Sequence, residues 1–137
     1  MIRVMHHILE VDSKIIPVTT DSAFIEALLD NWEIIKKQDN ISNSVWYTGR
    51  ILDLRLMNGS KNAKHNYRID EAILEADYII ISPWDLYTST ISNLIIWNIA
   101  LLIQQSRAQL IFVSNTTNKW WETYNYTVLD FVLSLER

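Results

Sequence analysis

The sequence predicts an α/β fold: a Rossmann-like three-layer sandwich with a mostly parallel sheet and an inserted β-hairpin. Two continuous apolar runs, at 78–81 and 110–113, are typical of strands that are buried on both faces. Apolar stripes with helical spacing at 69–76, 93–105 and 128–135 alternate with these runs. This alternation predicts that the two strands are adjacent and parallel, with helices covering the sheet. A chain of 137 residues is one domain at most.

The N-terminal part predicts a helix and then a hairpin. Apolar residues recur at helical spacing over 2–9, and the β-branched run 14–19, with Pro17, suits the end of a strand. Two strand-like runs, 24–29 and 33–36, flank a short turn and predict the hairpin.

The segment after the hairpin predicts a loop, a strand and a second loop. Residues 40–44 are polar enough for a loop, and the alternating apolar residues of 50–57 indicate a strand. The Asn-rich stretch 58–66 predicts an exposed loop, and 114–123 predicts another after the second apolar strand.

Composition and charge exclude several classes of function. The net charge of −4 and the pI near 5.3 give no basic footprint for nucleic acid. The longest apolar stretch, 94–103, is too short to span a membrane. Because no cationic, apolar leader opens the chain, we expect a cytoplasmic protein.

The residues that usually ligate metals are poorly placed. The absence of cysteine excludes disulfides, thiolate zinc sites and a cysteine nucleophile. His6 and His7 are neighbours on a predicted helix and point in different directions, and His65 lies alone in a polar loop. We therefore expect no metal site, and no catalytic residue stands out.

Three sequence blocks carry a family resemblance. Residues 76–89 read Ala-Asp-Tyr-Ile-Ile-Ile-Ser-Pro-Trp-Asp-Leu-Tyr-Thr-Ser, and Asn93-Leu94 follows. This block resembles the gluconeogenesis factor (YvcK) family, relatives of the CofD 2-phospho-lactate transferases, in which a strand runs into Gly-Pro-Gly-Ser-Leu-Tyr-Thr-Ser and then Pro-Asn-Leu. The family's second block, Asn-x-x-Thr-x-Pro-Gly-Glu-Thr-x-x-Tyr, is matched at Asn115, Thr117, Glu122, Thr123 and Tyr126. A weaker match lies at 16–19 and 38–41.

The resemblance implies a single partial domain over 1–137. The family's proteins are longer and begin with a strand and a Gly-Gly-Gly-Thr-Gly turn that cradles phosphates. Nothing in this sequence corresponds to that turn, although turns of this kind supply the free N–H groups that bind anions. We therefore expect the chain alone to bind UDP-sugars or dinucleotides weakly, if at all.

The candidate ligand site combines the two loops that follow the apolar strands, because α/β proteins bind ligands beyond the carboxyl ends of their strands. Thr88, Ser89 and Asn93 have an ordinary alternative role in satisfying a turn and capping a helix, and Glu122 and Thr123 an alternative as a capping pair before the last helix. Asp85 is otherwise a solvated turn residue. The candidate ligand-binding residues are Pro83, Trp84, Asp85, Tyr87, Thr88, Ser89, Asn93, Asn115, Glu122 and Thr123.

The function implied by the resemblance is binding of a UDP-sugar by a regulator of carbon metabolism and cell shape, without a cofactor. Two alternatives stay open. One is a CofD-like transferase that moves a phospholactyl-type group from a nucleotide, and the other is a non-functional fragment or a subunit that assembles with a missing half. The expected partner is a nucleotide-type small molecule, and a homo-oligomer is left open.

The six tryptophans and two glycines are an unusual balance. Trp84 and Trp121 occupy positions that the resemblance assigns to glycine, and Trp32 stands in the hairpin turn, where glycine is favoured. We interpret these residues as glycine codons read as tryptophan, with Trp46, Trp97 and Trp120 supporting the idea less. The alternative is that the tryptophans are genuine and the loops have diverged. The codons would decide, since only TGA fits the hypothesis.

Overall fold

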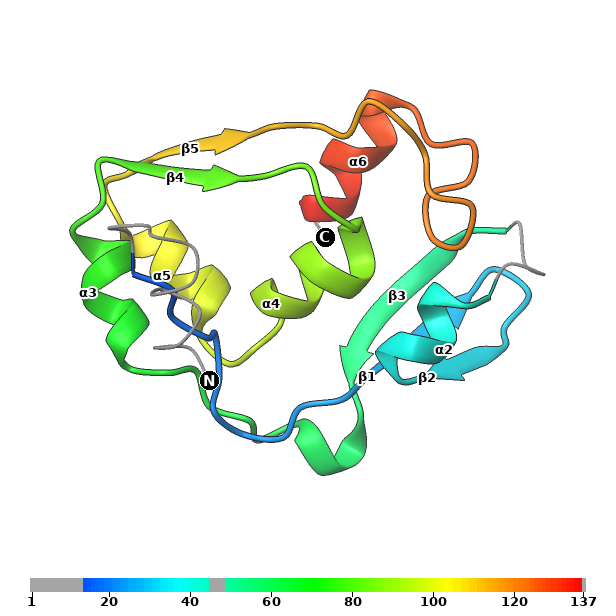
Figure 1. Ribbon diagram of the computed structural model, residues 1–137, viewed down its shortest axis with the longest axis horizontal. Helices are drawn as coiled ribbons and strands as arrows, with labels where there is room; N and C mark the ends of the chain where they lie inside the picture. The colour runs from blue at the N-terminus through cyan, green and yellow to red at the C-terminus, as the bar shows by residue number, and fades with distance from the viewer. Residues whose placement is uncertain (1–13, 45–48, 137) are drawn as a thin grey trace.

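The computed structural model describes residues 14–44 and 49–136, so the helix expected at 2–9 lies outside the described residues. Within these ranges the chain forms two small sheets with helices between and beside them (Figure 1). The α/β class is therefore confirmed. The run 14–19 has no strand, in contrast to the prediction.

The first sheet is antiparallel, with strand order β2-β1-β3. β1 (Ile25–Leu29) and β2 (Ile34–Lys36) form the predicted hairpin, and β3 (Ile51–Leu56) pairs with the other side of β1. Alternate side chains of β1 are buried, as the period of two along a strand requires. This sheet supplies a large part of the hydrophobic core.

The second sheet is the parallel pair β4 (Tyr78–Ile81) and β5 (Gln109–Phe112). Its register places Tyr78 opposite Gln109 and Ile81 opposite Phe112. The predicted parallel pairing of these strands is confirmed. The prediction of a mostly parallel sheet holds for this pair alone among the described strands, because β1 pairs antiparallel with both β2 and β3.

Two predicted loops contain helical turns. The expected loop 40–44 overlaps α2 (Gln38–Ser42), because Ile41 is an apolar residue that the turn buries completely in the core. The expected loop 58–66 begins with the 3-10 turn η1 (Asn58–Ser60), and Ser60 is buried because its hydroxyl accepts from the N–H of Phe24. The helices α3 (Arg68–Leu74) and α6 (Val128–Leu135) lie where the apolar stripes predicted them.

The helix predicted at 93–105 starts earlier and is interrupted. It comprises the π-helical η2 (Leu86–Ile91), the short α4 (Ser92–Leu94) and α5 (Ile99–Gln105). The break falls at Asn98, whose φ of 68° lies in the left-handed region that asparagine tolerates better than most residues. The segment before this break, which comprises η2 and α4, lies between the two sheets (Figure 1).

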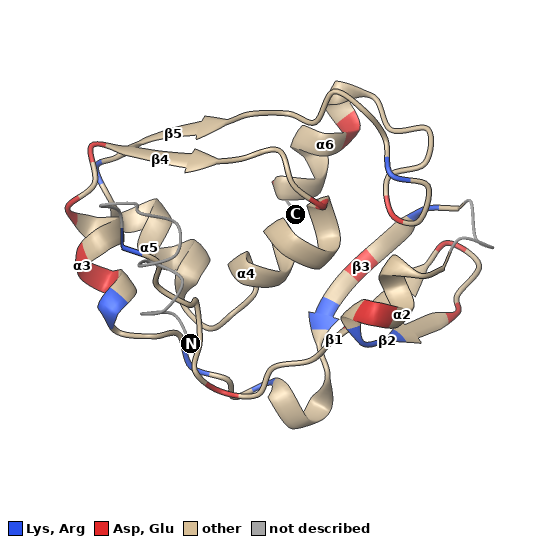
Figure 2. Cartoon of the chain, viewed as in Figure 1, with Lys and Arg blue, Asp and Glu red and all other residues tan. Residues whose placement is uncertain are grey.

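The charged residues are distributed unevenly. Figure 2 shows Lys, Arg, Asp and Glu on α2, α3 and the antiparallel sheet, whereas β4, β5, α4 and α5 carry none. In residues 14–44 and 49–136, no helix has both the length and the apolar character to cross a membrane.

Candidate functional site

A cavity of about 600 Å³ opens at the carboxyl end of β4, between this strand and the start of the following helix. Its polar groups are hydroxyls and amides that come from the turn after β4, from η2 and from α4. This is the position at which α/β folds place their ligands. Of the predicted ligand-binding residues, the cavity is lined by Trp84, Thr88, Ser89 and Asn93, together with Gln38, Ser82, Thr90 and Ser92.

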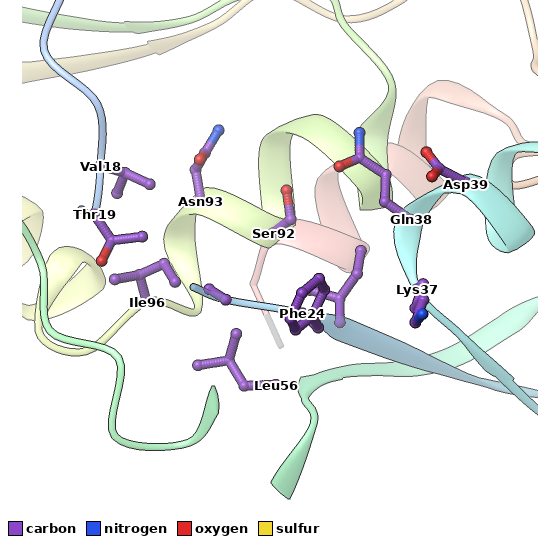
Figure 3. Close-up of a pocket in the computed structure, with 12 residues that line it drawn as sticks. Val18, Thr19, Phe24, Lys37, Gln38, Asp39, Leu56, Ser92, Asn93 and Ile96 are labelled. Carbon is purple, nitrogen blue, oxygen red and sulfur yellow. The ribbon is translucent and has the colours of Figure 1, made fainter. Parts of the chain in front are cut away.

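A second cavity of about 330 Å³ adjoins the first on the side of the antiparallel sheet. Gln38, Ser92 and Asn93 line both cavities, so the two adjoin, and together they are called here the η2–α4 cleft. Figure 3 shows Ser92 and Asn93 on the helical segment facing this space, with Lys37 across it. Ile25, Leu56 and Ile96 are among the apolar residues that line this second cavity. The sequence analysis did not include this cavity in the candidate site.

Lys37 adopts a backbone conformation that is costly for any residue with a β-carbon. Its φ and ψ are 72° and 143°, and it connects β2 to α2 at the wall of the second cavity. The conformation is held by the N–H of Lys37, which donates to the carbonyl of Ile25 over 2.8 Å. Backbone strain of this kind concentrates at functional sites.

Glu122 fixes the turn that begins η2. Its side chain is buried and accepts from the N–H of Tyr87 at 2.5 Å, from the N–H of Thr88 at 3.2 Å and from the Thr88 hydroxyl at 3.1 Å. Burial raises the pKa of the Glu122 carboxyl, and the nearby charge of Asp85 adds to the rise. The structure thus places Glu122 beneath the cleft, with its oxygens engaged by the protein.

Two other predicted ligand residues are also buried and engaged by the protein. The hydroxyl of Tyr87 donates to the carbonyl of Ile51 and lies 2.7 Å from the hydroxyl of Tyr126, where burial raises the pKa of Tyr126. The hydroxyl of Thr123 accepts from the N–H of Lys119 over 2.7 Å. These contacts support the loop rather than line a cavity.

The two loops meet at their tips. The amide of Asn115 donates to the carbonyl of Trp84 over 2.9 Å, and a small cavity of about 310 Å³ lies between the loops. Pro83 and Asp85 line it together with Lys119, whose ammonium group lies 3.8 Å from the Asp85 carboxylate. The sequence analysis did not include Lys119 among the candidate site residues. The signal that could have indicated it is that Lys119 is the one cation of loop 114–123.

The expected capping roles are wrong for Asn93 and for the pair Glu122 and Thr123. The helical segment already begins at Leu86, so the amide of Asn93 donates to the carbonyl of Ser89 within it. The last helix is capped by Thr127, whose hydroxyl accepts from the N–H of Asp130.

In the part of the chain that the structure describes, no group of three His, Asp or Glu residues could hold a metal ion. His65 lies 2.7 Å from Asp70 and 3.1 Å from the carbonyl of Trp97, away from the η2–α4 cleft. The larger cavity of the cleft is lined by neutral side chains, and the second cavity adds one cation, Lys37, and one carboxylate, Asp39. Lys119 lines only the small cavity between the loop tips, next to Asp85. The donors and acceptors of the cleft suit a polar ligand.

The tryptophans differ in their surroundings. Trp32 and Trp84 lie in bends and are 76% and 65% exposed, as predicted. Trp121 lies in a turn but is partly buried, and no described residue accepts a hydrogen bond from its buried indole N–H. Of the three, only Trp32 has a positive φ, at 67°.

Comparison with known proteins assigns this chain to a family. The family model for the 2-phospho-L-lactate transferase CofD matches residues 1–137. A relative from Thermotoga maritima is 33% identical over 136 residues, covering 99% of this chain and 41% of the relative. One from Clostridium acetobutylicum is 31% identical over 134 residues, covering 97% and 29%. Both are described as "Putative gluconeogenesis factor".

The same region is matched in solved structures. Two crystal structures of a protein from Bacillus halodurans, one described as a member of the UPF0052 family, superpose with TM-scores of 0.86 and 0.85 at 28% identity. The match covers 97% of this chain, and 41% and 42% of theirs. The chain thus spans less than half the length of the relatives it matches.

Proposed function

This chain belongs to the CofD family, and from that premise we propose that it forms part of the ligand site of a gluconeogenesis factor, a regulator of carbon metabolism and cell shape. The proposed ligand is a UDP-sugar. The observation that carries the proposal is the η2–α4 cleft, in which two adjoining cavities share Gln38, Ser92 and Asn93.

The chemistry of the cleft supports a nucleotide-sugar. Sugar hydroxyls both donate and accept, and they match the amides of Gln38 and Asn93 and the hydroxyl of Ser92. The diphosphate needs donors and positive charge, and Lys37 supplies an ammonium group in the second cavity, which the carboxylate of Asp39 also lines.

A transferase that moves a phospholactyl-type group from a nucleotide is the second candidate, and the name of the matching family model favours it. Transfer to a hydroxyl acceptor benefits from a general base within hydrogen-bond reach. The described residues that line the larger cavity carry hydroxyl, amide, indole and aliphatic side chains, without a carboxylate, imidazole or amine. The second cavity adds the carboxylate of Asp39 and the amine of Lys37. The larger cavity, which contains the predicted ligand residues Trp84, Thr88, Ser89 and Asn93, is therefore better suited to binding than to general base catalysis.

The test compares two asparagines in equivalent local roles. The amide of Asn93 donates to the carbonyl of Ser89 over 2.6 Å, and the amide of Asn43 donates to that of Asp39 over 2.7 Å, each four residues earlier. Asn93→Ala and Asn43→Ala therefore remove the same kind of bond, but only Asn93 lines the cleft. UDP-glucose is titrated into the wild-type chain and into each variant, and binding is monitored by NMR.

We expect the wild-type chain to bind UDP-glucose weakly, with shifts of the amide signals of Ser89, Thr90 and Asn93. Binding should be retained in Asn43→Ala and reduced in Asn93→Ala. Equal binding by the two variants would place the ligand elsewhere. Absence of any shift with the wild-type chain would reject the proposal and favour the interpretation as a non-functional fragment. Turnover of a phospholactyl nucleotide would favour the transferase.

A further inference from the structure

The second cavity of the η2–α4 cleft carries polar side chains that the protein itself does not use. Lys37, Gln38 and Asp39 line this cavity from the start of α2, and Ser92 and Asn93 line it from the opposite segment. Figure 3 shows Gln38 and Asp39 extending from α2 toward the segment that carries Ser92 and Asn93. Among the residues that the structure describes, no hydrogen bond or ion pair engages the side chains of Lys37, Gln38 and Asp39. These three side chains are therefore available to a ligand.

The free groups of this cavity are mostly acceptors. The hydroxyl of Ser92 donates to the carbonyl of Thr88 over 2.8 Å, and the amide of Asn93 donates to that of Ser89 over 2.6 Å. Each of these two side chains keeps an oxygen that can accept a further hydrogen bond. Asp39 adds a carboxylate, which as an ion only accepts. The cavity therefore suits a group that brings several O–H donors.

The two ends of a nucleotide-sugar differ in what they require. Sugar hydroxyls donate, whereas a diphosphate only accepts and is repelled by a carboxylate such as that of Asp39. The apolar side chains of Ile25, Leu56 and Ile96, which also line the second cavity, suit the C–H groups of a sugar ring. The described lining of the larger cavity includes no carboxylate, and that cavity lies at the carboxyl end of β4, where α/β folds bind their ligands. The sugar end thus fits the second cavity better than the diphosphate does.

We propose that the second cavity is the sugar subsite of the η2–α4 cleft, and that Asp39 accepts hydrogen bonds from the sugar hydroxyls. This assignment rests on the proposed function, since it orients the UDP-sugar named there. The diphosphate lies toward the larger cavity, and Lys37, which precedes Gln38 at the junction of the two cavities, offsets part of its charge. Asp39 thereby distinguishes a nucleotide-sugar from the nucleoside diphosphate without its sugar.

The test compares UDP-glucose with UDP, which lacks the sugar. Both ligands are titrated into the wild-type chain, into Asp39→Asn and into Glu71→Gln, and binding is monitored by NMR. Asp39→Asn removes the charge and keeps the shape of the side chain. Glu71→Gln is the matched control, because Glu71 is also an exposed carboxylate in the first turn of a helix but lines neither cavity of the cleft.

The wild-type chain and Glu71→Gln should bind UDP-glucose more tightly than UDP. Asp39→Asn should bind UDP-glucose about tenfold more weakly, because hydrogen bonds to a charged acceptor are lost. It should bind UDP at least as tightly as the wild-type chain does, because a repulsive charge is removed. The sugar should add amide shifts at Thr19 and Ile25, which line only the second of the two cavities.

If Asp39→Asn weakened UDP and UDP-glucose equally, or weakened neither, the subsite assignment would be overturned while the proposed function stood. Shifts at Thr19 and Ile25 that are as large with UDP as with UDP-glucose would also overturn it, since the ligand would then lie in the opposite direction. Absence of binding of either ligand to the wild-type chain would instead reject the proposed function, and the assignment with it. Circular dichroism should show both variants folded, because both side chains are exposed.

Discussion

Single residues with positive φ show how this sequence departs from local preference. The hairpin loop 30–32 is closed by the N–H of Leu29, which donates to the carbonyl of Glu33, and its third residue is Trp32 with φ 67°. Three-residue hairpin loops place a left-handed residue at this position, and glycine is favoured there. The Trp32 ring is largely exposed, so it gains little burial in return.

Trp32→Gly should therefore raise the free energy of unfolding by about 1 kcal/mol, because glycine has no β-carbon to clash in the left-handed conformation. Chemical denaturation measures the change. Trp84→Gly is the control, since Trp84 is also exposed but lacks a positive φ. A gain of equal size in both variants would disprove the backbone explanation, and codons other than TGA would end the recoding hypothesis.

Glu122 makes the stability of the chain depend on pH. Burial raises the pKa of its carboxyl above the ordinary value of 4.5, so the folded chain binds this proton more tightly than the unfolded chain. The contribution is fully present below pH 4.5 and is lost as the pH rises through the raised pKa of the folded state. Wild-type stability should thus fall over this range relative to Glu122→Gln, whose amide does not titrate.

Denaturation at a series of pH values from 4 upward measures this difference. Glu122→Gln keeps an oxygen for the N–H groups of Tyr87 and Thr88, and should remain folded. Glu122→Ala leaves these buried N–H groups without an acceptor, at a cost of about 1–3 kcal/mol for each. A stability difference between wild type and Glu122→Gln that is constant with pH would contradict the raised pKa.

At the scale of elements, α6 is the helix whose start is best defined. Thr127 and Asp130 form a capping box, in which the N–H of Thr127 donates to the Asp130 carboxylate over 2.8 Å. The Arg50 guanidinium donates to the same carboxylate over 2.6 Å and, as the largest effect, lowers the pKa of Asp130. The cap thus connects α6 to the residue that precedes β3.

Thr127→Ala should lower the free energy of unfolding by about 1 kcal/mol through loss of the cap. Thermal or chemical denaturation measures the loss. Thr127→Ser is the control, because it keeps the hydroxyl, and it should recover most of the stability. If the serine variant were as unstable as the alanine variant, the lost methyl group would be responsible and the capping explanation would fail.

At the scale of the whole molecule, the two sheets differ in how they are supported. The antiparallel sheet contributes the fully buried Ala27 and Leu29 to the core, whereas β4 and β5 have no fully buried side chain. Local opening is easiest where few apolar contacts are lost. The parallel pair should therefore open without unfolding the rest.

Native-state hydrogen exchange tests this difference. The amides that join β4 to β5 should exchange markedly faster than those of β1, since the latter open only with the core. Equal protection of the two sheets in the isolated chain would show that it unfolds as a single cooperative unit.

The sequence by itself determined the elements with strong local signals. Two strand-like runs around a short turn predicted the hairpin, and alternation predicted β3. Continuous apolar runs predicted β4 and β5, and helical stripes predicted α3 and α6. These patterns are local because side-chain period follows directly from backbone geometry. The motif at 76–89 and the Asn93-Leu94 pair after it likewise pointed to the segment that lines the cleft, and so to Trp84, Thr88, Ser89 and Asn93.

Only the tertiary structure decided which side chains reach the cleft and which support it. Glu122, Thr123 and Tyr87 belong to the same sequence blocks as the cleft residues, but burial against other segments turns their polar groups inward. Lys37 and Gln38 join the site from the segment after the hairpin because α2 packs beside η2. Such placements depend on contacts between segments far apart in the chain, and a local pattern does not encode them.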